Sequence, residues 1–162
     1  MMSTKEEILA LVSRYVQEQQ ASKTWTPGKD WVQYAGPVFD DSEYITAIDT
    51  LLNGWLVLGQ KGLNFEHKFP KIVDKDYGIL TNSGSSSNLI MMSALASKRL
   101  YNLQKGTKVI TPIAGFPTTI NPIFQLGFEP LFVDIDLDTL NLNLEQVEER
   151  AKEGAKVITF AH

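Results

Sequence analysis

The sequence predicts an α/β fold, a mostly parallel sheet with helices on both faces, and two observations support this prediction. From Tyr77 onward, short apolar runs alternate with segments of helical spacing. The runs are apolar throughout and do not alternate with polar residues, which is typical of strands in a parallel sheet that helices cover. Repeated strand–helix units therefore place this part of the chain in the α/β class.

The expected elements of this part follow one another regularly. Strand-like runs occur at Tyr77–Thr81, Lys108–Thr111, Pro130–Val133 and Lys156–Phe160. Helical runs lie between them, at about Ser86–Asn102, Thr118–Leu126 and Leu144–Lys152. Gly127 and Gly154 each follow one of these helices, where glycine commonly forms a left-handed C-terminal cap.

The N-terminal part reads as helical. Ser3 or Thr4 can cap a first helix, because a glutamate follows at capping-box spacing. Asp40 or Asp41 begins a second helix that Gly54 ends, and a short helix around Asn64–Phe69 is interrupted by Pro70. We expect residues 1–40 to form an N-terminal helix and an irregular arm, and residues 41–162 to be the N-terminal portion of a larger domain. The sequence ends on a predicted core strand, so we expect it to be truncated.

Composition limits the function classes. The 162 residues are 43% hydrophobic and 21% charged with a formal net charge of −4, as in an ordinary globular protein. Basic residues do not cluster, so no nucleic-acid partner is expected. The sequence has no cysteine, which excludes a disulfide, a thiolate nucleophile or an iron–sulfur cluster within this segment. No apolar run approaches the roughly 20 residues that span a membrane, and a cytoplasmic location is expected.

The loop Asn82–Asn88 is the first candidate site. It follows the predicted strand Tyr77–Thr81 and opens a helix, in the position where ligands bind in parallel α/β sheets. Gly84 lets a ligand approach the backbone, and free N–H groups with the hydroxyls of Ser85 and Ser86 favour an anion. A second interpretation is that a serine here only caps the helix. The spacing by itself does not separate the two.

The second candidate site is the loop after the strand Lys108–Thr111. Phe116 lies there between a glycine and a proline, where its face could be presented to a flat ring. Phenylalanine is also frequently a core residue, and that interpretation stays open. Asp134, Asp136 and Asp138 resemble metal ligands at first sight, but their segment has the composition of a turn, so no metal site is expected. His162 lies at the carboxyl end of a predicted strand.

Taken together, these motifs resemble a known family. Asn-Ser-Gly-Ser-Ser-Ser-Asn-Leu at residues 82–89, Ala-Gly-Phe-Pro-Thr-Thr-Ile-Asn-Pro at 114–122 and Phe-Val-Asp-Ile-Asp at 132–136 are similar to the DegT/DnrJ/EryC1/StrS family. These are sugar aminotransferases and dehydratases that use pyridoxal phosphate. Within the family the chain most resembles the CDP-4-dehydro-6-deoxyglucose 3-dehydratases of lipopolysaccharide, O-antigen and dideoxysugar biosynthesis. Residues 27–29, 53–56 and 160–162 also fit that subgroup.

The resemblance implies a role for several residues. Gly84 and Ser85, with Ser86 nearby, would hold the phosphate of pyridoxal or pyridoxamine 5′-phosphate, and Phe116 would stack on its pyridine ring. Trp55 and Gly59 would lie in a loop near a nucleotide-linked 4-keto-6-deoxy sugar. The resemblance also implies the aspartate-aminotransferase-like fold (fold type I), a homodimer and, in this subgroup, a reductase partner.

The catalytic residue is expected downstream of His162. There the family carries a histidine in dehydratases or a lysine in aminotransferases, and the subgroup carries the cysteines of a [2Fe-2S] cluster. Three functions therefore stay open. They are C3 dehydration of a CDP-4-keto-6-deoxyhexose, amino transfer to a nucleotide sugar, and a non-catalytic fragment or binding module. The isolated chain is expected to be inactive.

Overall fold

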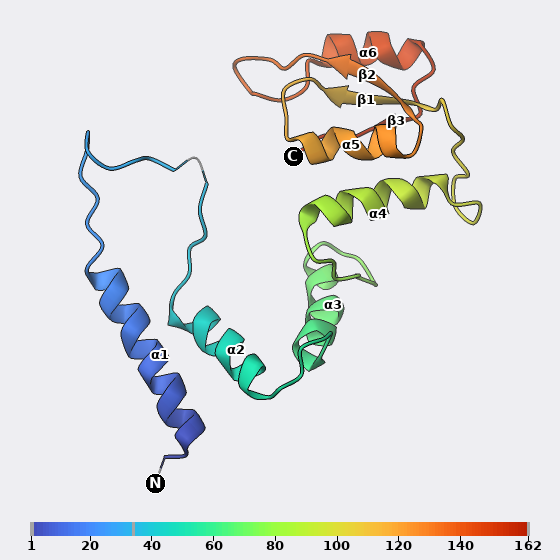
Figure 1. Cartoon of the computed structure of the whole chain (residues 1–162). Helices are drawn as coiled ribbons and strands as arrows, with labels where there is room; N and C mark the ends of the chain where they lie inside the picture. The colour runs from blue at the N-terminus through green and yellow to red at the C-terminus, as the bar shows by residue number, and fades with distance from the viewer. Residues whose placement is uncertain (1, 34, 162) are drawn as a thin grey trace. The chain divides into compact units, whose positions relative to one another are not determined.

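The computed structural model describes residues 2–33 and 35–161, and their elements follow the order helix, helix, helix, helix, strand, helix, strand, helix, strand (Figure 1). The helices are α1 Thr4–Ala21, α2 Asp41–Leu52, α3 Gln60–Ile72, α4 Gly84–Ala96, α5 Pro117–Gln125 and α6 Leu144–Lys152. The strands are β1 Lys108–Pro112, β2 Glu129–Val133 and β3 Val157–Ile158. No helix in the described ranges is long and apolar enough to cross a membrane.

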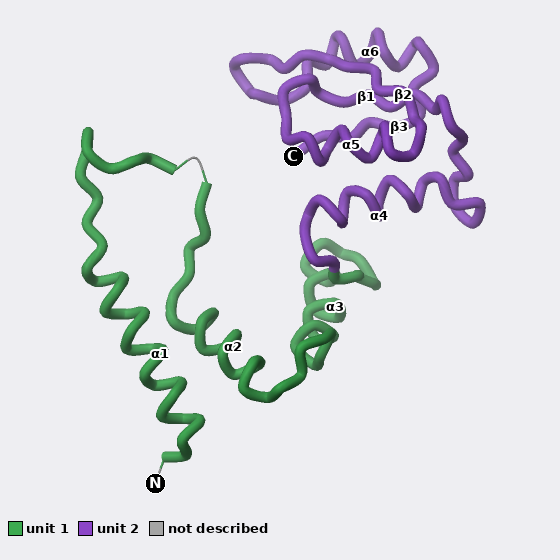
Figure 2. The backbone as a smooth tube through the Cα atoms, in the orientation of Figure 1, with its two compact units in different colours: residues 1–80 green, residues 81–162 purple. Residues whose placement is uncertain are grey.

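The chain separates into two compact units, residues 1–80 and 81–162, shown in different colours in Figure 2. The first holds α1, α2 and α3, and the second holds all the strands with the remaining helices. The predicted division at residue 40 concerns the organisation of a longer protein and stays a prediction.

The sheet of the second unit has three strands in the order β2-β1-β3, and both pairings are parallel. On β1, alternate side chains enter two different cores because successive residues of a strand point to opposite faces. Val109 packs with Met92 of α4 and Ile123 of α5. Ile110 packs on the other face, in the core that Val147 of α6 also contacts. Helices therefore cover both faces, and the predicted α/β class is confirmed.

The predicted helix starts and caps of the first unit are confirmed. Ser3 caps α1 in a capping box with Glu6, and Asp40 caps α2 in the same way with Glu43. Gly54, just beyond α2, has φ +71°, a left-handed conformation that glycine adopts at little cost.

The predicted strand Tyr77–Thr81 is wrong. The segment is irregular, and Tyr77 and Ile79 are 90% and 77% exposed. A strand needs a neighbour for its backbone hydrogen bonds, and no strand in the described ranges pairs with this one. The segment packs on α3 instead, where a Cβ at Gly78 would lie 2.5 Å from Pro70 Cγ.

Two helix boundaries also differ from the prediction. The helix predicted around residues 64–69 extends through Pro70 to Ile72, because the proline lies in its last turn and removes only one donor there. The helix predicted for 86–102 ends at Ala96. Beyond it the chain turns back, with Asn102 at φ +49°, and Leu103 joins the core against Met92 and Val109.

Candidate functional site

The loop Asn82–Asn88 forms the start of α4. Ser83 is the N-cap, and its hydroxyl accepts a hydrogen bond from the N–H of Ser86 at 3.2 Å. The Ser83 carbonyl accepts from the N–H of Ser87 at 3.0 Å. The capping interpretation is therefore confirmed for Ser83, while the anion site at the next residues stays a prediction.

Gly84 and Ser85 are exposed and open to an incoming anion. Their backbone N–H groups have no hydrogen-bond partner among the described residues, since the first N–H groups of a helix lack an intrahelical acceptor. A Cβ built on Gly84 would meet nothing within 4 Å, so the fold itself does not require glycine there. The first turn of α4 has no acidic residue, so its partial positive charge is uncompensated. These features fit the phosphate of a cofactor.

Phe116 lies at the carboxyl end of β1, as predicted, and its side chain is 66% exposed. The core interpretation of this residue is therefore wrong for this chain. Pro117 follows at the first position of α5 and fixes the backbone there, since proline is preorganised for a helix start. An exposed aromatic face held by a rigid helix start fits the flat ring of a cofactor.

One hydrogen bond links the two loops. The Asn88 side-chain amide donates to the Thr118 carbonyl at 3.3 Å, which ties α4 to the first turn of α5. The two helices pack alongside each other, with both N-termini toward the carboxyl end of β1 (Figure 1). The fold thus brings the Gly84–Ser86 segment and Phe116 into one neighbourhood.

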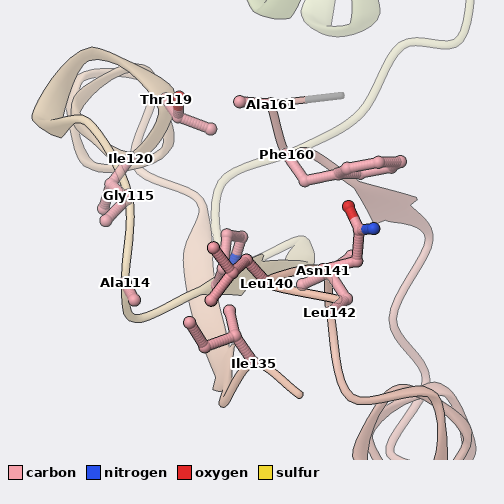
Figure 3. Close-up of a pocket in the computed structure, with 11 residues that line it drawn as sticks. Ala114, Gly115, Thr119, Ile120, Ile135, Leu140, Asn141, Leu142, Phe160 and Ala161 are labelled. Atoms are coloured by element: carbon pink, nitrogen blue, oxygen red, sulfur yellow. The ribbon is translucent and has the colours of Figure 1, made fainter. Parts of the chain in front are cut away.

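A cavity of about 100 Å³ adjoins the loop after β1, beyond the carboxyl ends of the strands, and neither the Gly84–Ser86 segment nor Phe116 is among its lining residues. It is lined by residues that follow each of the strands, among them Gly115 after β1, Leu140 after β2 and Phe160 after β3. Figure 3 shows the Asn141 amide directed toward the Phe160 ring. Sequence reasoning did not single out Leu140 or Asn141 as lining residues. The local sequence signal near them is the acidic segment Asp134–Asp138. In the structure, Leu140 follows this segment with φ +56°.

The acidic segment is held by its own hydrogen bonds. The Leu140 N–H donates to the Asp136 carbonyl at 2.7 Å, and the Asn143 amide donates to the Asp136 carboxylate at 2.7 Å. The Asp134 carboxylate accepts from the N–H of Ile135 at 2.8 Å. Asp136 therefore acts as a turn residue, as predicted, while Asp134 lies between β2 and the bridge at Ile135.

The other predicted positions lie elsewhere. Trp55 and Gly59 lie in the loop between α2 and α3, in the first unit. Trp55 is 62% exposed, and its indole N–H donates to the Leu58 carbonyl at 3.2 Å. His162 is outside the described residues.

The α/β fold of this chain is that of the aspartate-aminotransferase-like, fold type I enzymes. The structure of GDP-4-keto-6-deoxymannose-3-dehydratase with a trapped PLP-glutamate geminal diamine superposes with a TM-score of 0.71 at 32% identity, covering 78% of this chain and 33% of that one. Residues 38–162 match the DegT/DnrJ/EryC1/StrS aminotransferase family, and the chain belongs to that family.

Individual relatives agree with this assignment. The lipopolysaccharide biosynthesis protein RfbH of Salmonella typhimurium is 37% identical over 98% of this chain and 37% of its own length. The dTDP-4-dehydro-2,6-dideoxy-D-glucose 3-dehydratase of Saccharopolyspora spinosa is 36% identical over 98% of this chain and 34% of its own length. The structure of E. coli GDP-4-keto-6-deoxy-D-mannose-3-dehydratase with bound hydrated PLP superposes with a TM-score of 0.69. It is 34% identical, covering 77% of this chain and 32% of that one. The chain thus spans about a third of the length of these relatives.

Proposed function

We propose that this chain is the cofactor-phosphate part of a nucleotide-sugar 3-dehydratase that uses pyridoxal or pyridoxamine 5′-phosphate. In the complete protein it would remove the C3 hydroxyl of a CDP-4-keto-6-deoxyhexose, in dideoxysugar and O-antigen biosynthesis. The observation that carries the proposal is the pair of loops joined by the Asn88–Thr118 hydrogen bond, with an open anion cradle on one and an exposed aromatic face on the other. Named 3-dehydratases among the relatives support it.

The residues of this chain would bind and orient, while proton transfer falls to a residue beyond position 162. The Gly84 and Ser85 N–H groups and the Ser85 hydroxyl would hold the phosphate dianion at the positive end of α4. Phe116 would lie against one face of the ring and keep water from it. When bound, the cofactor supplies an electron-withdrawing ring that stabilises the charge developing as a proton leaves the sugar. Trp55 and Gly59 would contact the nucleotide sugar.

Amino transfer is the second candidate function, because the matched family is described as an aminotransferase family. The two functions differ in one residue beyond this sequence. A lysine there would hold the cofactor and support amino transfer from a separate amino donor, whereas a histidine would act in proton transfer without holding the cofactor. The third candidate is a non-catalytic fragment or binding module. We propose a cytoplasmic homodimer with a reductase partner for the complete enzyme.

The test has two steps. The coding sequence beyond codon 162 is read first, and a histidine at the catalytic position with downstream cysteines is expected. The complete protein is then incubated with pyridoxamine phosphate and a CDP-4-keto-6-deoxyhexose, and the products are analysed by mass spectrometry. Loss of water supports dehydration. A lysine and an aminated sugar would replace the proposal with amino transfer, and a stop codon would leave the third candidate.

A further inference from the structure

The loop Asn53–Gly59, between α2 and α3, is folded against itself. The Trp55 indole N–H donates to the Leu58 carbonyl at 3.2 Å. A Cβ at Gly59 would lie 3.0 Å from Trp55 Cδ1, so the indole lies tightly against this glycine. The loop therefore has a defined shape, although Trp55 to Leu58 are all exposed.

Both ends of this loop are bound to one carboxylate, that of Asp49 in α2. At the first end, Lys5 Nζ lies 2.6 Å from Asp49 Oδ1 and donates to Asn53 Oδ1 at 2.9 Å. At the second end, Lys61 Nζ lies 2.9 Å from Asp49 Oδ2 and donates to the Thr46 carbonyl at 3.1 Å. Asn53 is the C-cap of α2, and Lys61 lies in the first turn of α3. The two lysines thus clamp the loop at its start and just beyond its end.

The charges of this cluster are locally unfavourable. Lys5 lies in the first turn of α1, and Asp49 lies in the last turn of α2, which has no basic residue. A cation at a helix N-terminus and an anion at a C-terminus both oppose the helix dipole. Each charge opposes the dipole of its own helix end, and the tertiary pairing offsets this cost. Placement against local preference is typical of positions with a role beyond local stability.

The cluster is also the polar link between α3 and the helices before it. α1 and α2 pack on each other, whereas α3 makes no close backbone packing with either of them in the described ranges. The Lys61–Asp49 ion pair, with the Thr46 contact, therefore does much to fix where α3 begins relative to α2. Where α3 begins sets how the loop closes.

We propose that Asp49 is a positioning residue which, through Lys5 and Lys61, holds the loop Asn53–Gly59 in the shape that receives the nucleotide sugar. The N-terminal helix α1 thereby becomes part of substrate recognition through Lys5. The role of the loop rests on the proposed function, whereas the clamp itself rests on the distances above.

The clamp is tested on the 162-residue chain by hydrogen exchange. In Asp49→Asn, exchange across residues 53–59 is expected to rise about fivefold, as loss of exposed ion pairs predicts, with exchange in β1 and β2 unchanged. The control Asp138→Asn removes an exposed carboxylate that forms no side-chain hydrogen bond or ion pair with the described residues, and it should change nothing. Because Asp49→Asn removes an unfavourable charge from the end of α2, helix content by circular dichroism should hold or rise.

Variants of the lysines separate the clamp from general loosening. Lys61→Met leaves the α1–α2 packing untouched and should still raise exchange in the loop. Lys5→Met should raise exchange most at the start of the loop, because it removes both the pair with Asp49 and the hydrogen bond to Asn53. Unchanged exchange in Asp49→Asn and Lys61→Met would overturn the clamp.

The substrate role is tested in the complete protein. Asp49→Asn should raise KM for the nucleotide sugar several-fold, with kcat and the cofactor absorbance unchanged. If Asp49→Asn raises hydrogen exchange across residues 53–59 but leaves KM unchanged, the positioning role is overturned. The proposed function still stands in that case, provided that the wild type dehydrates the sugar. If the wild type does not dehydrate the sugar but exchange rises, the clamp stands and the proposed function fails.

Discussion

Phe116 and Phe124 lie at the two ends of α5 and are similarly exposed, at 66% and 58%. They differ in position, because Phe116 follows β1 at the ligand edge of the sheet and Phe124 lies in the last turn of the helix. This pair allows the proposed ring contact to be tested against a matched control.

Phe116→Leu should weaken cofactor binding by the complete protein about two- to tenfold, since stacking of aromatic rings contributes about 0.5–1.5 kcal/mol. Its thermal stability should change by less than about 0.5 kcal/mol, as expected for an exposed side chain. Fluorescence titration with pyridoxal phosphate measures the affinity, with Phe124→Leu as the unaffected control. Equal affinities for the two variants would remove Phe116 from the site.

Gly84 stays a predicted ligand-facing glycine. Five other glycines have positive φ, between +71° and +88°, and glycine is explained there by the backbone. Gly84 is helical and faces open space, so neither conformation nor packing explains it.

Among the secondary-structure elements, α1 and α2 show how a local motif can be read from the sequence. Both begin with a capping box whose carboxylate is stabilised in the folded state. The Ser3 backbone N–H and then its hydroxyl lower the pKa of Glu6 below its ordinary 4.5. Hydrogen bonds from Ser42 lower the pKa of Asp40 below 3.8.

The helix content of the first unit should therefore fall with acid. A carboxylate whose pKa is depressed on folding stabilises the helix fully above its ordinary pKa, and the stabilisation is lost as the pH falls through the lowered folded value. Far-UV circular dichroism should show loss of helix only below the ordinary values of 4.5 and 3.8 for these groups. Glu6→Gln should remove the contribution of α1 to the pH dependence of the circular dichroism signal. Helix loss that begins near neutral pH would contradict this account.

The predicted strand Tyr77–Thr81 and the end of α4 show where local patterns fail. Tyr77–Thr81 is a short apolar run like the other predicted strands, but a strand forms only when another strand supplies hydrogen bonds. The pattern beyond Ala96 continues the helical spacing, yet burial of Leu103 in the core turns the chain back. In both segments the deciding contacts are remote in sequence.

Across the whole molecule, burial is uneven. In the described part of the first unit only Val16 and Pro70 are buried, whereas the second unit has two apolar cores around its sheet. Stability depends on apolar area removed from water, so the second unit should be the more resistant to unfolding.

Ile123→Ala should expose this difference. Ile123 is fully buried against Val109 and Phe128, and its truncation should lower the unfolding free energy of the second unit by about 2–5 kcal/mol. Hydrogen exchange under increasing denaturant should show earlier opening of residues 108–133 with no change in residues 4–52. Phe124→Leu, at the neighbouring exposed position, should leave both regions as they are. Simultaneous loosening of both regions would show that the units unfold together.

The sequence by itself determined the α/β class and the capped helix starts, and it predicted the two loops of the candidate site. These depend on short-range rules, namely capping spacing, strand–helix alternation and glycine at a helix start. Only the tertiary structure decided that Phe116 is exposed, that Tyr77–Thr81 is not a strand, and that Lys5 and Lys61 meet at Asp49. Each of these depends on which distant residues come into contact, and a pattern within one segment carries no information about its neighbours in space.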